Sequence, residues 1–218
     1  MELDISKYRV NHHSQCGEDG VIAKLFQILN IEKGWLVEFG AWDGIYLSNT
    51  YCHYKNSPNF NLLAIESEEE RFEQLAQNLG NNPRSVLLNR KVELEGENSL
   101  TNIFHQANID NIALLSIDVD GEDFEIWKTL NKNKFRPAIV VIEFGKWTNK
   151  DELDVLESQF KNDDYNLVCV TGNFIFVDSR LGISCKENIH ELLRTSGSPE
   201  YNLFYGLIDK IKFDAEIQ

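Results

Sequence analysis

The sequence predicts an α/β fold built on a mainly parallel β-sheet, and two observations carry this prediction. Five short apolar runs alternate with segments of helical spacing, the pattern of a parallel sheet covered by helices on both faces. The apolar runs occupy residues 35–39, 62–65, 85–88, 113–119 and 138–144. Two further strand-like runs follow close together near the end of the chain, so an antiparallel hairpin is expected to complete a sheet of seven strands.

Segments with helical spacing precede the first strand and separate the later ones. In Glu18–Leu29 the apolar residues recur on one helical face, and Glu18 and Asp19 put negative charge in the first turn, where the helix dipole favours it. The helices expected after the five strands lie near residues 47–54, 68–79, 100–106, 124–130 and 153–160. A further helix is expected at residues 187–194.

The hairpin is predicted from Tyr165–Val170 and residues 174–177. Thr171-Gly172-Asn173 joins these runs, a connection too short for a crossover helix. Five parallel strands followed by a hairpin are typical of class I methyltransferases rather than of six-stranded dinucleotide-binding folds.

The length and composition predict one domain. With 218 residues and 42% hydrophobic side chains, the chain is large enough to bury one full core. We therefore expect a single domain over residues 1–218, with an N-terminal lead at 1–13, a core at 14–180 and a C-terminal extension at 181–218.

The charge balance restricts the class of partner. The chain carries 35 acidic and 21 basic residues, a formal net charge of −14, and its lysines and arginines are scattered along the sequence. Such a surface repels polyanions, so we expect no nucleic-acid partner. A neutral or cationic small molecule is the expected ligand.

The cysteines and the N-terminus indicate a cytoplasmic protein. The four cysteines lie far apart and form no C-x-x-C pair, so neither a zinc site nor a disulfide framework is indicated. Residues 1–9 lack the basic and apolar regions of a signal peptide. No stretch approaches the roughly 20 apolar residues of a membrane span, so no membrane association is expected.

The turn at residues 36–44, LVEFGAWDG, is the strongest candidate for a cofactor site. Small ligands bind outside the carboxyl ends of the strands in open α/β sheets, where this turn lies. A second apolar run ends in Glu66, 22 residues after Gly44, a separation suited to an acid on ribose hydroxyls. In a dinucleotide loop, however, Trp42 would replace the second glycine, and Glu38 and Asp43 would oppose a pyrophosphate. The same acids favour a cationic ligand such as S-adenosylmethionine.

Five motifs resemble those of FkbM-type methyltransferases. They are SQCGEDG at 14–20, VEFGAWDG at 37–44, SNT at 48–50, IDVDG at 117–121 and VIEF at 141–144. The resemblance runs over residues 14–177 and departs from the family pattern at Gly145, where the family usually has asparagine. It implies a class I fold, S-adenosylmethionine as cofactor, and O-methylation of a hydroxyl on a sugar, a glycan or a natural-product small molecule.

The resemblance and the strand-end positions together nominate the cofactor-binding residues. They are Gln15, Glu38, Gly40, Asp43, Gly44, Ser48, Asn49, Glu66 and Asp118. Glu38 is expected to hold the methionine ammonium, Glu66 the ribose diol, and Ser48 and Asn49 the methionine carboxylate. The competing interpretation is structural: an acid that caps a turn, glycines that only allow the turn, and polar residues that only begin a helix.

The catalytic candidates are Asp118, Glu143 and His12. Asp118, Asp120 and Glu143 suit Mg²⁺ or Mn²⁺, and a bound cation would lower the pKa of an acceptor hydroxyl. The alternative is a metal-free general base, Asp118 or a nearby His12 or His13. Asp120 has an equally good alternative role, because an Asp at this position can also cap the following helix.

Three functional hypotheses follow. The first is an O-methyltransferase, the second a non-catalytic S-adenosylmethionine-binding sensor or scaffold, and the third an NAD-dependent oxidoreductase, against which Trp42 argues. The sequence predicts neither the acceptor nor the oligomeric state.

Overall fold

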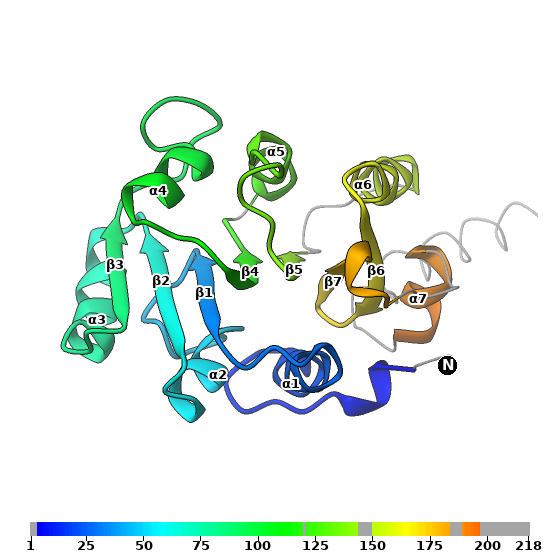
Figure 1. Ribbon diagram of the computed structural model, residues 1–218, viewed down its shortest axis with the longest axis horizontal. Coiled ribbons are helices and arrows are strands. Elements are labelled where there is room, and N and C mark those ends of the chain that lie inside the picture. Colours follow the sequence, from blue (N-terminus) through cyan, green and yellow to red (C-terminus); the bar gives the residue numbers. More distant parts are fainter. Residues whose placement is uncertain (1–3, 120, 144–149, 184–188, 197–218) are drawn as a thin grey trace, which may run out of the picture.

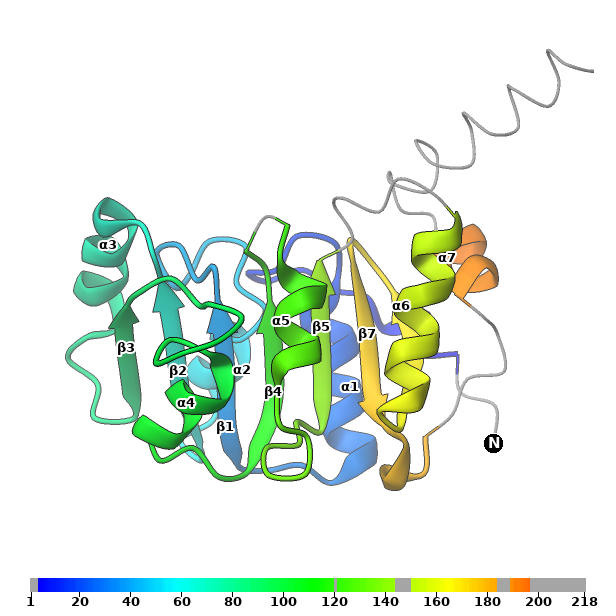
Figure 2. The same cartoon turned by 90° about the horizontal axis from the view of Figure 1, so that it is seen from above.

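A seven-stranded β-sheet with helices on both faces runs through the protein (Figures 1 and 2). The computed structural model describes residues 4–119, 121–143, 150–183 and 189–196. The strands are β1 (Gly34–Phe39), β2 (Phe60–Glu66), β3 (Ser85–Asn89), β4 (Ile112–Ile117), β5 (Ile139–Glu143), β6 (Tyr165–Val170) and β7 (Asn173–Asp178), in the order β3-β2-β1-β4-β5-β7-β6. Six of these strands run in the same direction, and β7 alone runs in the opposite one. The predicted sheet of mainly parallel strands with a final hairpin is therefore confirmed.

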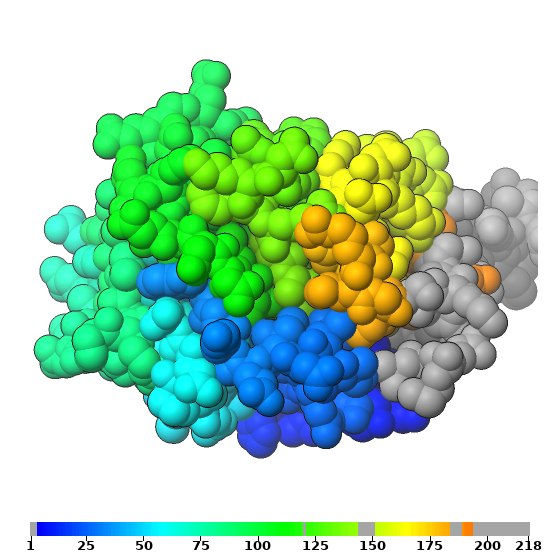
Figure 3. Space-filling view, viewed as in Figure 1, coloured from blue at the N-terminus to red at the C-terminus, as the bar shows by residue number. Residues whose placement is uncertain are grey.

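The helices form two layers. Those on one face are α1 (Glu18–Leu29), α2 (Tyr51–Asn56) and α3 (Glu69–Leu79). Those on the other are α4 (Leu100–Gln106), α5 (Asp123–Thr129) and α6 (Lys150–Asn162), with α7 (Ile189–Ser196) beside α6 and β6. In the space-filling view, α1 covers the lower side of the molecule and α5 and α6 the upper side (Figure 3). Short 3₁₀ turns at Ser6–Tyr8 and Ser179–Leu181 complete the described structure.

The apolar periodicity explains the two layers. Every residue of β4 is buried, as expected of a central strand covered on both faces. On the side of α5 and α6, aromatic rings dominate the core: Trp127 stacks on Phe160 at 4.6 Å between ring centroids, and Phe160 stacks on Phe176 at 3.7 Å. The other core is mainly aliphatic and lies under α1 and α3.

Strands β1 and β4 lie side by side at the centre of the sheet, where the strand order reverses. From β1 the chain moves outward to β2 and β3 and then returns to β4, so the loops after β1 and β4 diverge and leave a crevice. Gly40 follows β1 with φ of 73°, and a Cβ there would lie 1.5 Å from the backbone oxygen of Asp118. Only glycine lets the two strand ends approach so closely.

One predicted helix is shorter than expected. The spacing at 47–54 predicts a helix, but α2 begins only at Tyr51. Leu47 has φ of 57°, which no helix allows, and the backbone amide of Asn49 bonds to a side chain instead of to a helix carbonyl. The other boundaries differ by a few residues, and positions 187–188 of the last predicted helix lie outside the described residues.

The sequence also predicts that the chain contains no membrane span and forms one domain. Within the described ranges, no helix is long and apolar enough to cross a membrane. The assignment of residues 1–218 to one domain stays a prediction.

Candidate functional site

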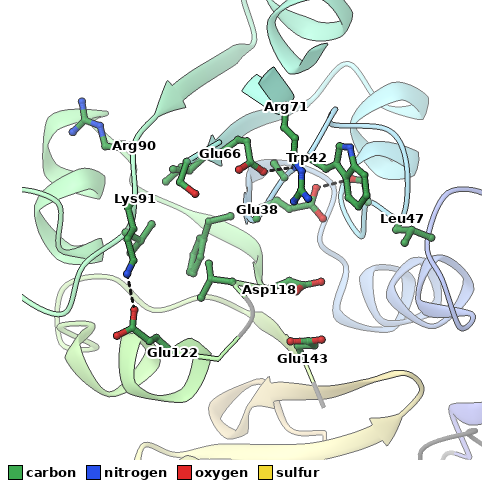
Figure 4. A pocket seen from close by; sticks show the side chains of 18 of the residues that line it. Glu38, Trp42, Leu47, Glu66, Arg71, Arg90, Lys91, Asp118, Glu122 and Glu143 are labelled. Atoms are coloured by element: carbon green, nitrogen blue, oxygen red, sulfur yellow. Dashed lines mark hydrogen bonds and ion pairs between the residues drawn. The ribbon is translucent and has the colours of Figure 1, made fainter. Parts of the chain in front are cut away.

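A cavity of about 470 Å³ lies at the carboxyl ends of β1, β2 and β4 (Figure 4). The ionisable side chains that line it are the carboxylates Glu38, Glu66, Asp118, Glu122 and Glu143 and the cations Arg71, Arg90 and Lys91. Five carboxylates against three cations leave the lining with excess negative charge. The cavity therefore favours a ligand that carries positive charge.

Glu38 ends β1 as a buried carboxylate that organises the next loop. Its Oε2 accepts hydrogen bonds from the hydroxyls of Ser48 at 2.6 Å and Thr50 at 2.7 Å, and its Oε1 accepts the amide of Asn49 at 2.7 Å. Burial raises the pKa of the Glu38 carboxyl, although these hydrogen bonds act in the opposite direction. A cation bound beside Glu38 would favour its charged form.

The loop at 48–50 is also tied to β4. The side-chain amide of Asn49 donates to the hydroxyl of Ser116 at 3.0 Å, and Ser116 lies opposite Glu38 in the register of β1 and β4. The Asn49 Oδ1 atom is buried and has no hydrogen-bond partner among the described residues. The loop is thus held by two adjacent strands before any ligand binds.

Glu66, at the end of β2, shapes the turn after β1. Its Oε2 accepts the backbone amide of Trp42 at 2.8 Å, and its Oε1 accepts that of Glu68 at 2.8 Å. Each carboxylate oxygen has two lone pairs, so Glu66 still has acceptor capacity toward the cavity that it lines.

Trp42 forms an aromatic rim with its neighbours. The Arg71 guanidinium stacks on the Trp42 ring at 4.2 Å from the centroid, and the Trp42 and Tyr46 rings meet edge to face at 5.6 Å. Trp42 is 39% exposed and Tyr46 58% exposed, although most large apolar side chains are buried. Figure 4 shows Arg71 lying against Trp42 at one side of the cavity.

Asp118, Asp123 and Glu143 gather where β4 and β5 end. One oxygen of each carboxylate lies within 4.8 Å of the other two. Asp123 also accepts the backbone amides of Val119 at 2.7 Å and Gly121 at 2.9 Å, and so holds the loop that enters α5. The predicted ligand Asp120 lies outside the described residues, whereas Asp123, which sequence reasoning did not nominate, completes the cluster.

The N-terminal segment contains two buried acids that serve the fold. Asp19 Oδ2 accepts the backbone amides of His12, His13 and Ser14, and these bonds outweigh burial, so the pKa of Asp19 is lowered. Glu18 accepts the Thr171 hydroxyl at 2.5 Å and so joins the start of α1 to the β6–β7 turn.

The structure brings together about half of the predicted site residues. Glu38, Gly40, Ser48, Glu66, Asp118 and Glu143 line the cavity, whereas His12, Gln15, Asp43, Gly44 and Asn49 do not. His12 and Gln15 are exposed beside the start of α1. Asp43 Oδ1 accepts the amides of Ile45 and Tyr46. Gly44 packs on the side chains of Leu75 and Leu79. The ligand roles of all these residues stay predictions.

Three cations of the lining were missed by sequence reasoning. Arg90 and Lys91 directly follow β3, and Arg71 lies in the first turn of α3. Lys91 pairs with Glu122 at 3.1 Å, and Arg90 donates to Gln106 at 3.0 Å. Their position immediately after a parallel strand was an available signal, because all such strand ends meet at one edge of the sheet.

Solved structures with a similar fold are class I methyltransferases. A putative tRNA (m1A22) methyltransferase from Streptococcus pneumoniae is 11% identical with a TM-score of 0.54, over 88% of this chain and 86% of that one. TrmK from M. capricolum, solved with S-adenosylhomocysteine, is 12% identical with a TM-score of 0.53, over 89% and 85%. No protein-family model and no curated protein matches the chain. At such low identity these similarities show the fold, which is the Rossmann-like fold of class I methyltransferases.

Proposed function

We propose that this protein is an S-adenosylmethionine-dependent methyltransferase that acts on a hydroxyl oxygen of a sugar, a glycan or a natural-product small molecule. The observation that carries the proposal is the carboxylate-lined cavity at the ends of β1, β2 and β4. The fold supports it, because related folds use this edge of the sheet for their ligands. The acceptor class rests on the motif resemblance and on the net charge of −14, which disfavours a nucleic-acid acceptor.

The cavity residues fit the chemistry of this cofactor. When bound, S-adenosylmethionine supplies an electrophilic methyl group on a positively charged sulfur. Glu38 places a negative charge at the end of β1, where an ammonium or sulfonium is stabilised. Glu66 retains acceptor capacity for a ribose diol, and charge-assisted hydrogen bonds of this kind are among the stronger ones.

The same residues disfavour a dinucleotide. A pyrophosphate at this turn would meet the charge of Glu38, and the amide of Trp42 is already donated to Glu66. Backbone amides of the glycine turn are the groups that bind a pyrophosphate in dinucleotide folds. The NAD-dependent oxidoreductase hypothesis is therefore not favoured.

Asp118 and Glu143 are the proposed proton acceptors. Asp118 is exposed and Glu143 half-buried, and both line the cavity, whereas His12 does not. The acceptor hydroxyl loses its proton as the oxygen–carbon bond forms, and a carboxylate oxygen can take that proton. Positioning of the acceptor oxygen against the methyl group would supply most of the remaining rate enhancement.

A divalent cation is the alternative to direct proton transfer. Asp118, Asp123 and Glu143 offer the oxygen ligands that Mg²⁺ and Mn²⁺ prefer, and a cation there would lower the pKa of a bound hydroxyl. Exhaustive chelation distinguishes the two. Unchanged methyl transfer after chelation supports carboxylate bases, and activity that is lost and then restored by Mg²⁺ supports the metal.

Calorimetric titration with S-adenosylmethionine and with NAD, in separate experiments, tests the cofactor. We expect saturable binding of S-adenosylmethionine and none of NAD, and binding of NAD alone would overturn the proposal. Formation of S-adenosylhomocysteine with a panel of sugars and natural-product alcohols then tests the activity. Binding without turnover on any acceptor would favour the sensor or scaffold hypothesis, and transfer only to RNA would contradict the acceptor class.

A further inference from the structure

A second cavity, of about 540 Å³, lies between α2, the end of α3 and the loop that enters β3. Its lining includes Tyr51, Tyr54, Lys55, Asn81, Asn82 and Arg84, none of which lines the first cavity. The polar groups of this lining are amides, phenols and cations. It therefore differs in chemistry from the first cavity.

The charge of the second cavity is opposite to that of the protein. Lys55 and Arg84 line it, no carboxylate does, and the chain as a whole has a net charge of −14. Within the described ranges, neither cation forms a salt bridge. Instead Lys55 lies over the Tyr51 ring at 5.5 Å and Arg84 over the Tyr54 ring at 4.3 Å. Two cations without a protein counter-charge make this cavity suitable for an anion.

Arg84 is held in a fixed orientation. Its Nη1 donates to the backbone oxygens of Phe60 at 2.6 Å and Ser57 at 3.1 Å. In the part of the chain that the structure describes, its side-chain hydrogen bonds all start from Nη1. A guanidinium has donors on three nitrogens in a rigid fork, so Nε and Nη2 keep donors that match an oxyanion.

Tyr54 adds a polar group without a partner. Tyr54 belongs to the lining, the residue is only 3% exposed, and its buried hydroxyl has no hydrogen-bond partner among the described residues. A buried hydroxyl without a partner is costly, and a ligand oxygen would satisfy it. Asn81, an exposed residue of the same lining, offers an amide donor at the mouth.

The second cavity is connected to the turn that shapes the first. The Asn78 side-chain amide, in the lining of the second cavity, donates to the backbone oxygen of Asp43 at 2.9 Å. Leu79, also in that lining, packs against Gly44 at the end of the turn. A ligand here would therefore contact Asn78 and Leu79, the side chains that support the Gly40–Gly44 turn.

We propose that the second cavity binds a small oxyanion ligand, a phosphate monoester or a carboxylate, and that its occupancy changes ligand affinity at the first cavity. The anion would lie between Lys55 and Arg84, with the Tyr54 hydroxyl and the Asn81 amide as further donors. The binding part of this proposal does not depend on the proposed function, because the anion is detected without S-adenosylmethionine.

Titration of the full chain with inorganic phosphate, glucose 6-phosphate and glucuronate, followed by NMR, tests the binding. We expect saturable shifts at Lys55 and Arg84, and the two organic probes distinguish a phosphate from a carboxylate ligand. Lys55→Gln should weaken binding by about two- to fivefold, the range for one exposed ionic contact, and Arg84→Gln by more. Lys33→Gln, an exposed lysine outside the cavity lining, is the charge-matched control and should bind as the wild type does.

Two outcomes would overturn the site. One is the absence of saturable shifts with all three probes, and the other is equal weakening by Lys55→Gln and Lys33→Gln, which means general charge screening. Because Arg84 also holds backbone carbonyls, Arg84→Gln is interpreted only if its unfolding midpoint matches that of the wild type, and Lys55→Gln carries the test otherwise.

The coupling is tested by titrating S-adenosylmethionine with and without a saturating second-site anion. We expect the affinity to change by about fivefold or more, and Asn78→Ala, which removes the hydrogen bond to the Asp43 carbonyl, to reduce that change when both proteins are saturated with the anion. Anion binding with an unchanged S-adenosylmethionine affinity would contradict the coupling. Failure of S-adenosylmethionine to bind at all would contradict the proposed function, and the anion titrations would still decide whether the second cavity is a binding site.

Discussion

The two halves of the first cavity use their carboxylates differently. In the β1–β2 half, Glu38 is 5% exposed and Glu66 4% exposed, and their oxygens accept hydrogen bonds from the loops that surround the ligand site. In the β4–β5 half, Asp118 is exposed and Glu143 half-buried. The carboxylates of the first half therefore support the fold and are also the proposed cofactor ligands, whereas those of the second half are more accessible and are the proposed proton acceptors. Substitutions in the two halves should separate stability from activity.

The largest effect is expected from Glu38→Ala. Removing this carboxylate leaves the Ser48 and Thr50 hydroxyls and the Asn49 amide buried without their acceptor. Each buried donor left without an acceptor costs about 1–3 kcal/mol of unfolding free energy, and Glu38 serves three of them. Urea unfolding followed by circular dichroism measures it, with Glu38→Gln as the variant that keeps one acceptor oxygen and loses less. An unfolding free energy within about 0.5 kcal/mol of wild type would show that Glu38 does not support the loop.

The second effect concerns pH and His53, a buried residue of α2. Burial lowers the pKa of His53 to about 4 from its ordinary 6.5, although the nearby Asp19 charge acts in the opposite direction. Because the folded pKa lies below the unfolded one, the stabilisation from neutral His53 is complete above pH 6.5. This stabilisation is lost as the pH falls from 6.5 toward 4, because His53 binds a proton in the unfolded chain before it does so in the folded protein.

The size of this loss is roughly 2–4 kcal/mol, from the difference between the two pKa values. Unfolding free energies at intervals between pH 7 and pH 4 measure it. His53→Leu should flatten the slope, whereas His105→Leu, at an exposed histidine in α4, should keep it. Equal slopes in the wild type and His53→Leu would mean that folding does not change the pKa of His53.

The fold could be predicted from the sequence because its signals are local. The apolar runs and the short Thr171-Gly172 connection of the hairpin depend on few residues and do not require knowledge of distant contacts. The boundary of α2 depends on a distant residue: Glu38 accepts the amide of Asn49 across 11 positions and prevents the helix from starting earlier. The apolar spacing within residues 47–54 cannot reveal that bond, because Glu38 lies outside this segment.

The site could be predicted in its β1–β2 half and less well elsewhere. Glu38 and Glu66 end strands and are therefore identified from strand prediction alone. The position of Arg90 and Lys91 directly after β3 indicates the correct edge of the sheet, but their distance from β1 along that edge depends on the strand order, which local patterns do not specify. Asp123 joins Asp118 and Glu143 because α5 begins there, and helix starts are among the least certain boundaries in a sequence.

The third effect is on ligand binding in the β1–β2 half. Glu66→Ala removes the proposed acceptor for a ribose diol and the bond to the Trp42 amide. S-adenosylmethionine should bind about 10- to 100-fold more weakly, which corresponds to roughly 1–3 kcal/mol. Glu70→Ala, at an exposed glutamate of α3, is the matched control and should bind normally. Calorimetric titration measures both, and equal affinities in the two variants would remove Glu66 from the site.

The smallest effect on stability is expected in the β4–β5 half, from Asp118→Asn and Glu143→Gln. Gly40 packs against the backbone oxygen of Asp118, not its side chain, so the strand ends stay in place when the carboxylate is replaced. The unfolding free energy of Asp118→Asn should remain within about 0.5 kcal/mol of wild type, as for most exposed positions, and that of Glu143→Gln, at a half-buried position, should fall by no more than about 1 kcal/mol. Methyl transfer should nevertheless fall by about 100-fold or more, because the amides cannot accept the hydroxyl proton. If either variant instead unfolds as readily as Glu38→Ala, the β4–β5 carboxylates also support the fold, and the distinction between the two halves is lost.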